Sequence, residues 1–160
     1  MEEVKRKNLL TWILLTGLLT GTIDALLAII ISYKIPAATI FKFIASGVFG
    51  MAAFGPNAEM IYYGILFHYC IAFAWATTFF LLYDKLLSIL KIRSVLILVT
   101  GLIIWVIMNL VVVPLSHTPP QPFHIIRVIE GFAALLLAFG VPVTVIADKF
   151  YSTTSASLHE

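Results

Sequence analysis

LLTWILLTGLLTGTIDALLAIIISY, residues 9–33, is an almost unbroken apolar run in which Asp24 is the only charged side chain. A helix needs about 20 mostly apolar residues to cross the hydrocarbon core of a bilayer. The run therefore predicts a membrane span, flanked by Lys7 and Lys34. The apolar region of a cleaved signal peptide has only about 7–15 residues, so we interpret this run as a retained anchor.

Three further runs have the length and composition of a span, and they cover about residues 60–83, 94–113 and 123–147. The segment 36–56 is shorter and carries Lys42, which favours an interfacial or a re-entrant helix over a fifth span. The sequence thus predicts an all-α polytopic membrane protein. Its single domain, residues 1–151, is a four-transmembrane-helix bundle with an interfacial or re-entrant helix between spans one and two. Residues 152–160 are predicted to form a disordered tail.

The composition of the whole chain agrees with a membrane protein. Of the 160 residues, 61% are apolar and 11% are charged, and a soluble domain has about 25% charged residues. A soluble enzyme, a disordered protein and a nucleic-acid-binding protein are therefore poor fits, and the net charge of +2 gives no footprint for nucleic acid. Cys70 is the only cysteine, which excludes an internal disulfide.

The basic residues are distributed unevenly about the four predicted spans, with seven on the side of both termini and three on the other. Cytoplasmic loops carry an excess of Lys and Arg, so we expect both termini to be cytoplasmic. A fifth span would erase this bias. The seven are Lys5, Arg6, Lys7, Lys85, Lys91, Arg93 and Lys149, and the three are Lys34, Lys42 and Arg127.

Each predicted span carries one polar residue in the outer half of the bilayer. At 1.5 Å per residue, Asp24 and His68 lie at nearly the same depth, roughly 14–15 Å from the outer ends of their spans. Asn109 and Glu130 lie roughly 7–10 Å deep. We hypothesise a buried polar cluster of these four residues in which a carboxylate beside a histidine binds protons. In the alternative interpretation, Asp24 and His68 only fix the packing of spans one and two.

Small residues predict close helix packing. Gly17 and Gly21 form a GxxxG motif on the first span, and such motifs let helices approach closely. Gly64 lies four residues before His68, on the same face, where it could admit a neighbouring helix. Pro142 removes a backbone hydrogen bond inside the fourth span and predicts a kink.

The sequence contains no pattern of a soluble catalytic site, such as Gly-x-Ser-x-Gly, His-Glu-x-x-His or a phosphate loop. We therefore expect no enzymatic activity. His68 has no second histidine at its depth to share a haem, and His117 and His124 fall in the loop between spans three and four. We expect no cofactor and no metal.

Four stretches together resemble a known family: GTIDA (21–25), IASGVFG (44–50), GILFHY (64–69), and VIMN (106–109) with VPLS (113–116). On these stretches the chain resembles the YagU-like small bacterial inner-membrane proteins, a family without an established activity. The resemblance covers about residues 15–147 and implies a multi-pass protein of the bacterial inner (plasma) membrane. It marks the positions Asp24, Ser46, Gly47, His68, Asn109 and Pro114.

The family often carries a histidine before a Gly-x-Pro in span four. Here Gly140-Val141-Pro142 is present, but Leu135 stands at the histidine position, which puts histidine-pair chemistry in doubt.

Two non-enzymatic functions follow as hypotheses, beside a third, an intramembrane enzyme for which Asp24 and His68 are the only candidate acid–base pair. The first is a small membrane protein that is proton-responsive or related to acid stress and uses the polar cluster; it predicts sensitivity at Asp24 and His68. The second is a structural or accessory subunit that packs with itself or a larger membrane complex; it predicts sensitivity at Gly17 and Gly21. Both take the lipid bilayer as partner, and neither involves nucleic acid.

Overall fold

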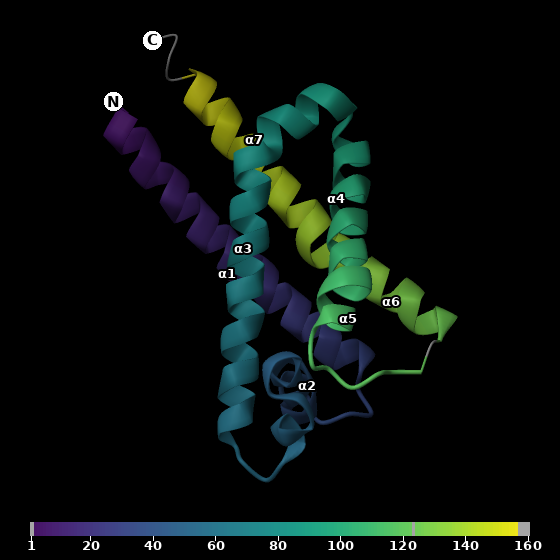
Figure 1. The fold of residues 1–160 in the computed structure, drawn as a ribbon. Helices are drawn as coiled ribbons and strands as arrows, with labels where there is room; N and C mark the ends of the chain where they lie inside the picture. The colour runs from purple at the N-terminus through teal and green to yellow at the C-terminus, as the bar shows by residue number, and fades with distance from the viewer. Residues whose placement is uncertain (1, 123, 157–160) are drawn as a thin grey trace.

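A computed structural model describes residues 2–122 and 124–156 of the chain. Every regular element among these residues is helical (Figure 1). In chain order they are α1 (Glu2–Ile31), α2 (Ala37–Phe49), the 3-10 turn η1 (Gly50–Phe54), α3 (Glu59–Leu90), α4 (Arg93–Ile107), the π turn η2 (Met108–Val112), α5 (Val113–Leu115), α6 (Ile125–Leu135), the π turn η3 (Leu136–Gly140) and α7 (Val141–Ala156).

Five helical segments of the described chain are long and apolar enough to cross a membrane. The predicted all-α class is therefore confirmed, and the composition of these segments is that of a membrane protein. Four of the five coincide with the predicted spans. The fifth, Ala37–Phe54, joins the 13-residue α2 to η1 and coincides with the predicted interfacial or re-entrant segment.

Both ends of the chain lie at the same end of the bundle, which we call the terminal end, and α2 lies at the opposite end (Figure 1). α1 and α3 are antiparallel neighbours, because Gly17 faces Phe73 whereas Gly21 faces Tyr69. α3 and α4 run side by side, and the helix made of α6, η3 and α7 crosses them obliquely (Figure 1).

Three helix boundaries differ from the sequence prediction. α3 continues seven residues past the predicted end at Tyr83, until Lys91 adopts the left-handed conformation (φ 59°) that ends it. The helix predicted to stop at Pro114 continues as α5 to Leu115. α7 reaches Ala156, so helix covers part of the segment for which we expected disorder; residues 157–160 lie outside the described part.

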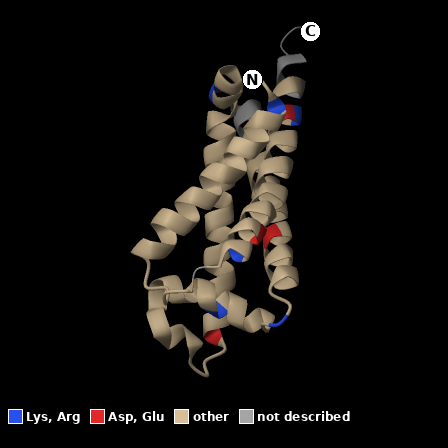
Figure 2. Ribbon diagram, turned by 90° about the vertical axis from the view of Figure 1, so that its right-hand side faces the viewer, with Lys and Arg blue, Asp and Glu red and all other residues tan. Residues whose placement is uncertain are grey.

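The core at the terminal end consists of large side chains from α1, α3, α4 and α7. Its buried members are Ile13, Phe79, Phe80, Tyr83, Leu96, Val143, Ala147 and Phe150. Next to this core, the Tyr83 hydroxyl donates to Asp148 Oδ1 (2.8 Å), which also pairs with Arg93 (2.9 Å). Figure 2 shows charged residues at the two ends of the bundle and a further group of acidic and basic residues part-way along it.

Candidate functional site

Small residues bring α1 and α3 together where Asp24 and His68 lie. A Cβ on Gly21 would be 3.0 Å from the Cβ of Ala72, and one on Gly17 would overlap the ring of Phe73. Because neither glycine has a side chain, the two helices approach closely at this crossing. The GxxxG motif of α1 thus packs against α3 of the same chain.

His68 uses this close approach to bond the backbone of α1. Its Nε2 lies 2.8 Å from the carbonyl oxygen of Gly21, and the side chain is buried. A carbonyl oxygen can only accept a hydrogen bond, so Nε2 carries the hydrogen and donates. The neutral imidazole then has a bare Nδ1, which is the nitrogen that can take up a proton.

Asp24 and His68 line one cavity of about 180 Å³, which we call the central cavity. Asp24 is partly buried and makes no hydrogen bond or ion pair within the described residues. The remaining walls are apolar and come from α2, α3, α4 and the helix around η3. They consist of Ile44, Ile71, Ala72, Trp75, Ile104, Met108, Leu135 and Phe139.

Two π turns border the central cavity, and each is followed within two residues by a proline. η2 begins at Met108 and precedes Pro114, and η3 contains Phe139 and precedes Pro142. A proline ring clashes with the carbonyl four residues earlier, which in both cases lies inside the π turn. The wider turn makes room for the ring, and such turns are frequent at functional sites. A π turn thus lies directly before Pro142, and the kink expected there stays a prediction.

The structure brings two of the four predicted cluster residues into the central cavity and places the other two elsewhere. Asn109 is exposed and donates from Nδ2 to the Trp105 carbonyl (2.9 Å). Glu130 lies 3.9 Å from Arg127 on its own helix. Asn109 and Arg127 line a separate cavity of about 500 Å³ beneath the proline-rich loop. The expected four-residue cluster is thus a pair, because Asn109 and Glu130 take local partners.

The predicted packing glycine of α3 lies where α2 crosses that helix. A Cβ on Gly64 would overlap the carbonyl oxygen of Phe41 and lie 3.0 Å from its Cα. The neighbouring helix that the sequence allowed at this position is therefore α2.

The positions marked by the family resemblance connect α2 to the loop after α5. The buried Ser46 donates to the Phe43 carbonyl on its own helix (2.6 Å). The Gly47 carbonyl accepts from the amide of His117 (3.0 Å), three residues after Pro114. Ser46, Gly47 and Pro114 therefore do not line the central cavity; Gly47 and Pro114 line two other cavities.

Sequence reasoning missed the aromatic wall of the central cavity. Trp75 and Phe139 line it, and Trp75 packs against the small core that contains Phe139. The spacing from Trp75 to His68 is seven residues, which places both on one face of a helix. That spacing could have indicated Trp75, whereas nothing local marks Phe139.

No group of three or more His, Cys, Asp or Glu side chains that could hold a metal occurs among the described residues. The expectation of a metal-free protein stays a prediction, as does the resemblance to the YagU-like proteins. In comparisons with known proteins, no family model, no curated protein and no solved structure matches this chain.

Proposed function

We propose that the chain crosses the bacterial inner membrane four times and that α2 is interfacial or re-entrant. The antiparallel arrangement of α1 and α3 supports this topology, because one full crossing between them would make the two helices run in the same direction. The length of α2 also supports it. Its 13 residues rise about 20 Å, less than the hydrocarbon core of about 30 Å.

In this topology the terminal end of the bundle is cytoplasmic, in line with the excess of Lys and Arg on that side. The test uses single cysteines in a Cys70→Ser background, labelled in intact cells with a membrane-impermeant maleimide. We expect labelling of Asn57→Cys, before α3, and protection of Ser88→Cys, near the end of α3. The reverse result would contradict the proposed topology, because either a fifth crossing or an inverted orientation would produce it.

We propose that Asp24 and His68 form a proton-binding pair and that the protein is a non-enzymatic, proton-responsive membrane protein related to acid stress. The observation that carries the proposal is their joint position in the central cavity. Ionisable residues within membrane spans are costly and usually functional. An ionised Asp24 attracts a protonated His68 in the same cavity, which lowers the cost of burying either charge alone.

No other ionisable side chain of the described residues lines the central cavity. On α2, the Lys42 ammonium donates to the Gly55 carbonyl (2.6 Å). On α6, Arg127 and Glu130 pair with each other. On α3, the Tyr69 hydroxyl is 2.9 Å from that of Thr22. A proton taken up in this cavity therefore changes the charge of Asp24 or His68.

The test follows the fluorescence of Trp75, which lines the same cavity, in a Trp12→Phe, Trp105→Phe background in lipid nanodiscs. We expect the fluorescence to change in a sigmoidal way with pH as a proton binds in the central cavity. His68→Gln keeps an amide donor for the Gly21 carbonyl and should abolish the change. Asp24→Asn should shift its midpoint, because the carboxylate no longer interacts with the imidazole.

His124→Gln is the matched control, because His124 lies in the outer loop, away from Trp75. It should leave the titration unchanged. If the His68→Gln protein titrates as the parent does, the proton-binding pair is refuted. If Asp24→Asn leaves the midpoint, the fold and acid survival of cells unchanged, Asp24 has no part in it.

The alternative, a structural or accessory subunit, is supported by the broad apolar surface of the helices. Side chains such as Leu15, Ile30 and Leu81 are 61–67% exposed. Purification of the chain alone separates the two proposals. A subunit of a larger complex is expected to lose stability in this state, whereas a proton-binding protein is expected to stay folded and to keep its pH titration.

A further inference from the structure

Two hydrogen-bond acceptors of the central cavity have no partner, yet a ligand can reach them. Neither the carboxylate of Asp24 nor Nδ1 of His68 makes a hydrogen bond or an ion pair within the described residues. In this part of the chain, the buried side-chain atoms that lack both a partner and accessible surface are the hydroxyls of Thr16, Thr100 and Thr144. The two acceptors of the central cavity are not among them, so they keep accessible surface.

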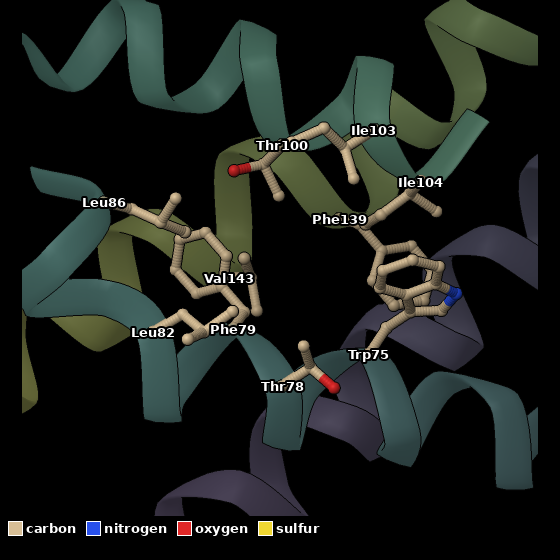
Figure 3. Close-up of a pocket in the computed structure, with 10 residues that line it drawn as sticks. All are labelled: Trp75, Thr78, Phe79, Leu82, Leu86, Thr100, Ile103, Ile104, Phe139 and Val143. Atoms are coloured by element: carbon tan, nitrogen blue, oxygen red, sulfur yellow. The ribbon is translucent and has the colours of Figure 1, made fainter. Parts of the chain in front are cut away.

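The walls of the central cavity include two aromatic rings, those of Trp75 and Phe139. Figure 3 shows both rings together at one end of a second cavity of about 100 Å³, which they also line. The polar side chains of this second cavity are Thr78 and Thr100, and no ionisable side chain of the described residues lines it. Of the two cavities that share these rings, only the central cavity can therefore present a negative charge to a ligand.

The central cavity carries one net negative charge when Asp24 is ionised and His68 is neutral. An isolated charge is costly in apolar surroundings. On the neighbouring helices, the Lys42 ammonium of α2 donates to a backbone carbonyl, and Arg127 of α6 pairs with Glu130. Neither of these basic side chains lines the cavity, so neither neutralises Asp24 there. A ligand with a single positive charge would neutralise it.

We propose that the central cavity binds the ammonium group of a compact primary amine. The Asp24 carboxylate neutralises the ammonium and accepts one of its N–H groups, and Nδ1 of the neutral His68 accepts a second. The apolar body of the amine lies against Trp75 and Phe139, and an ammonium near aromatic rings gains further attraction. This assignment rests on the proposed proton-binding pair for its pH dependence, because a proton on Nδ1 of His68 would remove that acceptor and repel the ammonium.

The size and the ligand set of the central cavity favour this class over other ligands. A cavity of about 150 Å³ holds one benzene ring, and the central cavity, at about 180 Å³, is slightly larger. Hard metal cations take about six or more oxygen ligands, whereas Asp24 supplies the only side-chain oxygens that line this cavity. A neutral ligand would leave the ionised carboxylate without a counter-charge.

The test measures Trp75 fluorescence during addition of benzylamine, in the Trp12→Phe, Trp105→Phe background in nanodiscs at about pH 8, where an alkylamine is protonated. We expect a saturable change. Benzyl alcohol has the same ring and no charge, and we expect it to bind at least about tenfold more weakly. This comparison of two ligands uses one protein, so it does not depend on whether a variant folds.

Asp24→Asn keeps the size of the side chain and removes its charge. We expect it to weaken benzylamine binding at least about tenfold and to leave the binding of benzyl alcohol unchanged. The matched control is Glu130→Gln, which neutralises another carboxylate of an apolar helical segment, paired with Arg127 and outside the central cavity. It should leave the affinity for benzylamine unchanged. Thermal unfolding of both variants establishes that they fold.

The proposal is overturned if benzyl alcohol binds as tightly as benzylamine, if Asp24→Asn weakens both ligands equally, or if it has no larger effect than Glu130→Gln. It is also overturned if the fluorescence change does not saturate, or if Na⁺ at the same concentration displaces benzylamine, because the site then takes inorganic cations. The pH titration of Trp75 is done without amine, so the proton-binding pair survives if no amine binds. Saturable benzylamine binding together with an unchanged titration of His68→Gln would refute only the pair.

Discussion

The terminal end of the bundle and the end near α2 are packed by opposite means. At the terminal end, large rings such as Phe80 and Tyr83 are fully buried and fill the space between helices. Near α2, Gly64 and Ala45 let backbones meet directly, and the central cavity and the cavity beneath the proline-rich loop lie in this half and the middle.

The difference shows how one small bundle combines stability with a polar site. Rings pack to high density and leave little room for a polar group. Glycine and alanine contacts hold helices at fixed distances, and the two π turns widen the spaces between them. Asp24 and His68 lie where packing is incomplete. The packed core at the terminal end holds the same helices together, so the cavity near α2 does not have to be filled for the bundle to fold.

The largest loss of stability is expected from removing a buried ring at the terminal end. Phe80→Ala removes a ring that is 0% exposed, and such a change costs about 3–5 kcal/mol of unfolding free energy. The measurement is equilibrium unfolding in mixed dodecyl maltoside and SDS micelles. Leu81→Ala is the control, because Leu81 is the next residue and is 67% exposed. Equal losses for the two variants would show that the buried rings do not stabilise the terminal end more than exposed side chains do.

A smaller effect is expected at the α2–α3 crossing. Gly64→Ala places a Cβ against the Phe41 carbonyl, and the backbone can only yield if α2 moves. Forcing a methyl group into a packed contact costs about 1–3 kcal/mol. The same unfolding measurement applies, and cysteine labelling at Asn57→Cys reports the displacement of α2. A stable variant with unchanged labelling would mean that α2 does not need this close contact.

The smallest effect is expected from the matched glycine, Gly131→Ala on α6. A Cβ there would meet Trp105 Nε1 at 3.5 Å, an ordinary contact. Because alanine favours helix over glycine by up to about 1 kcal/mol, we expect a neutral or slightly stabilising change. If Gly131→Ala lowered the free energy of unfolding as much as Gly64→Ala does, the cost of replacing a helical glycine would not depend on what the glycine contacts.

The long apolar helices could be predicted from the sequence because their length and apolarity are written in it. The central cavity could not. Depth along a helix places Asp24 and His68 at one level, but it says nothing about rotation around the helix axis, and that rotation separates Asn109 from the pair. Asn109 lies inside η2, where the extra residue of a π turn changes which face a side chain occupies. Only packing between helices determines that face.

The position of Gly17 and Gly21 also bears on self-association. GxxxG motifs commonly hold two copies of a helix together, yet here both glycines are buried against α3. A homodimer would therefore have to assemble through exposed aliphatic side chains and not through these two glycines. Bulky substitutions at Gly17 or Gly21 would first separate α1 from α3 within one protomer. A loss of dimers in such variants would therefore result from misfolding of the protomer.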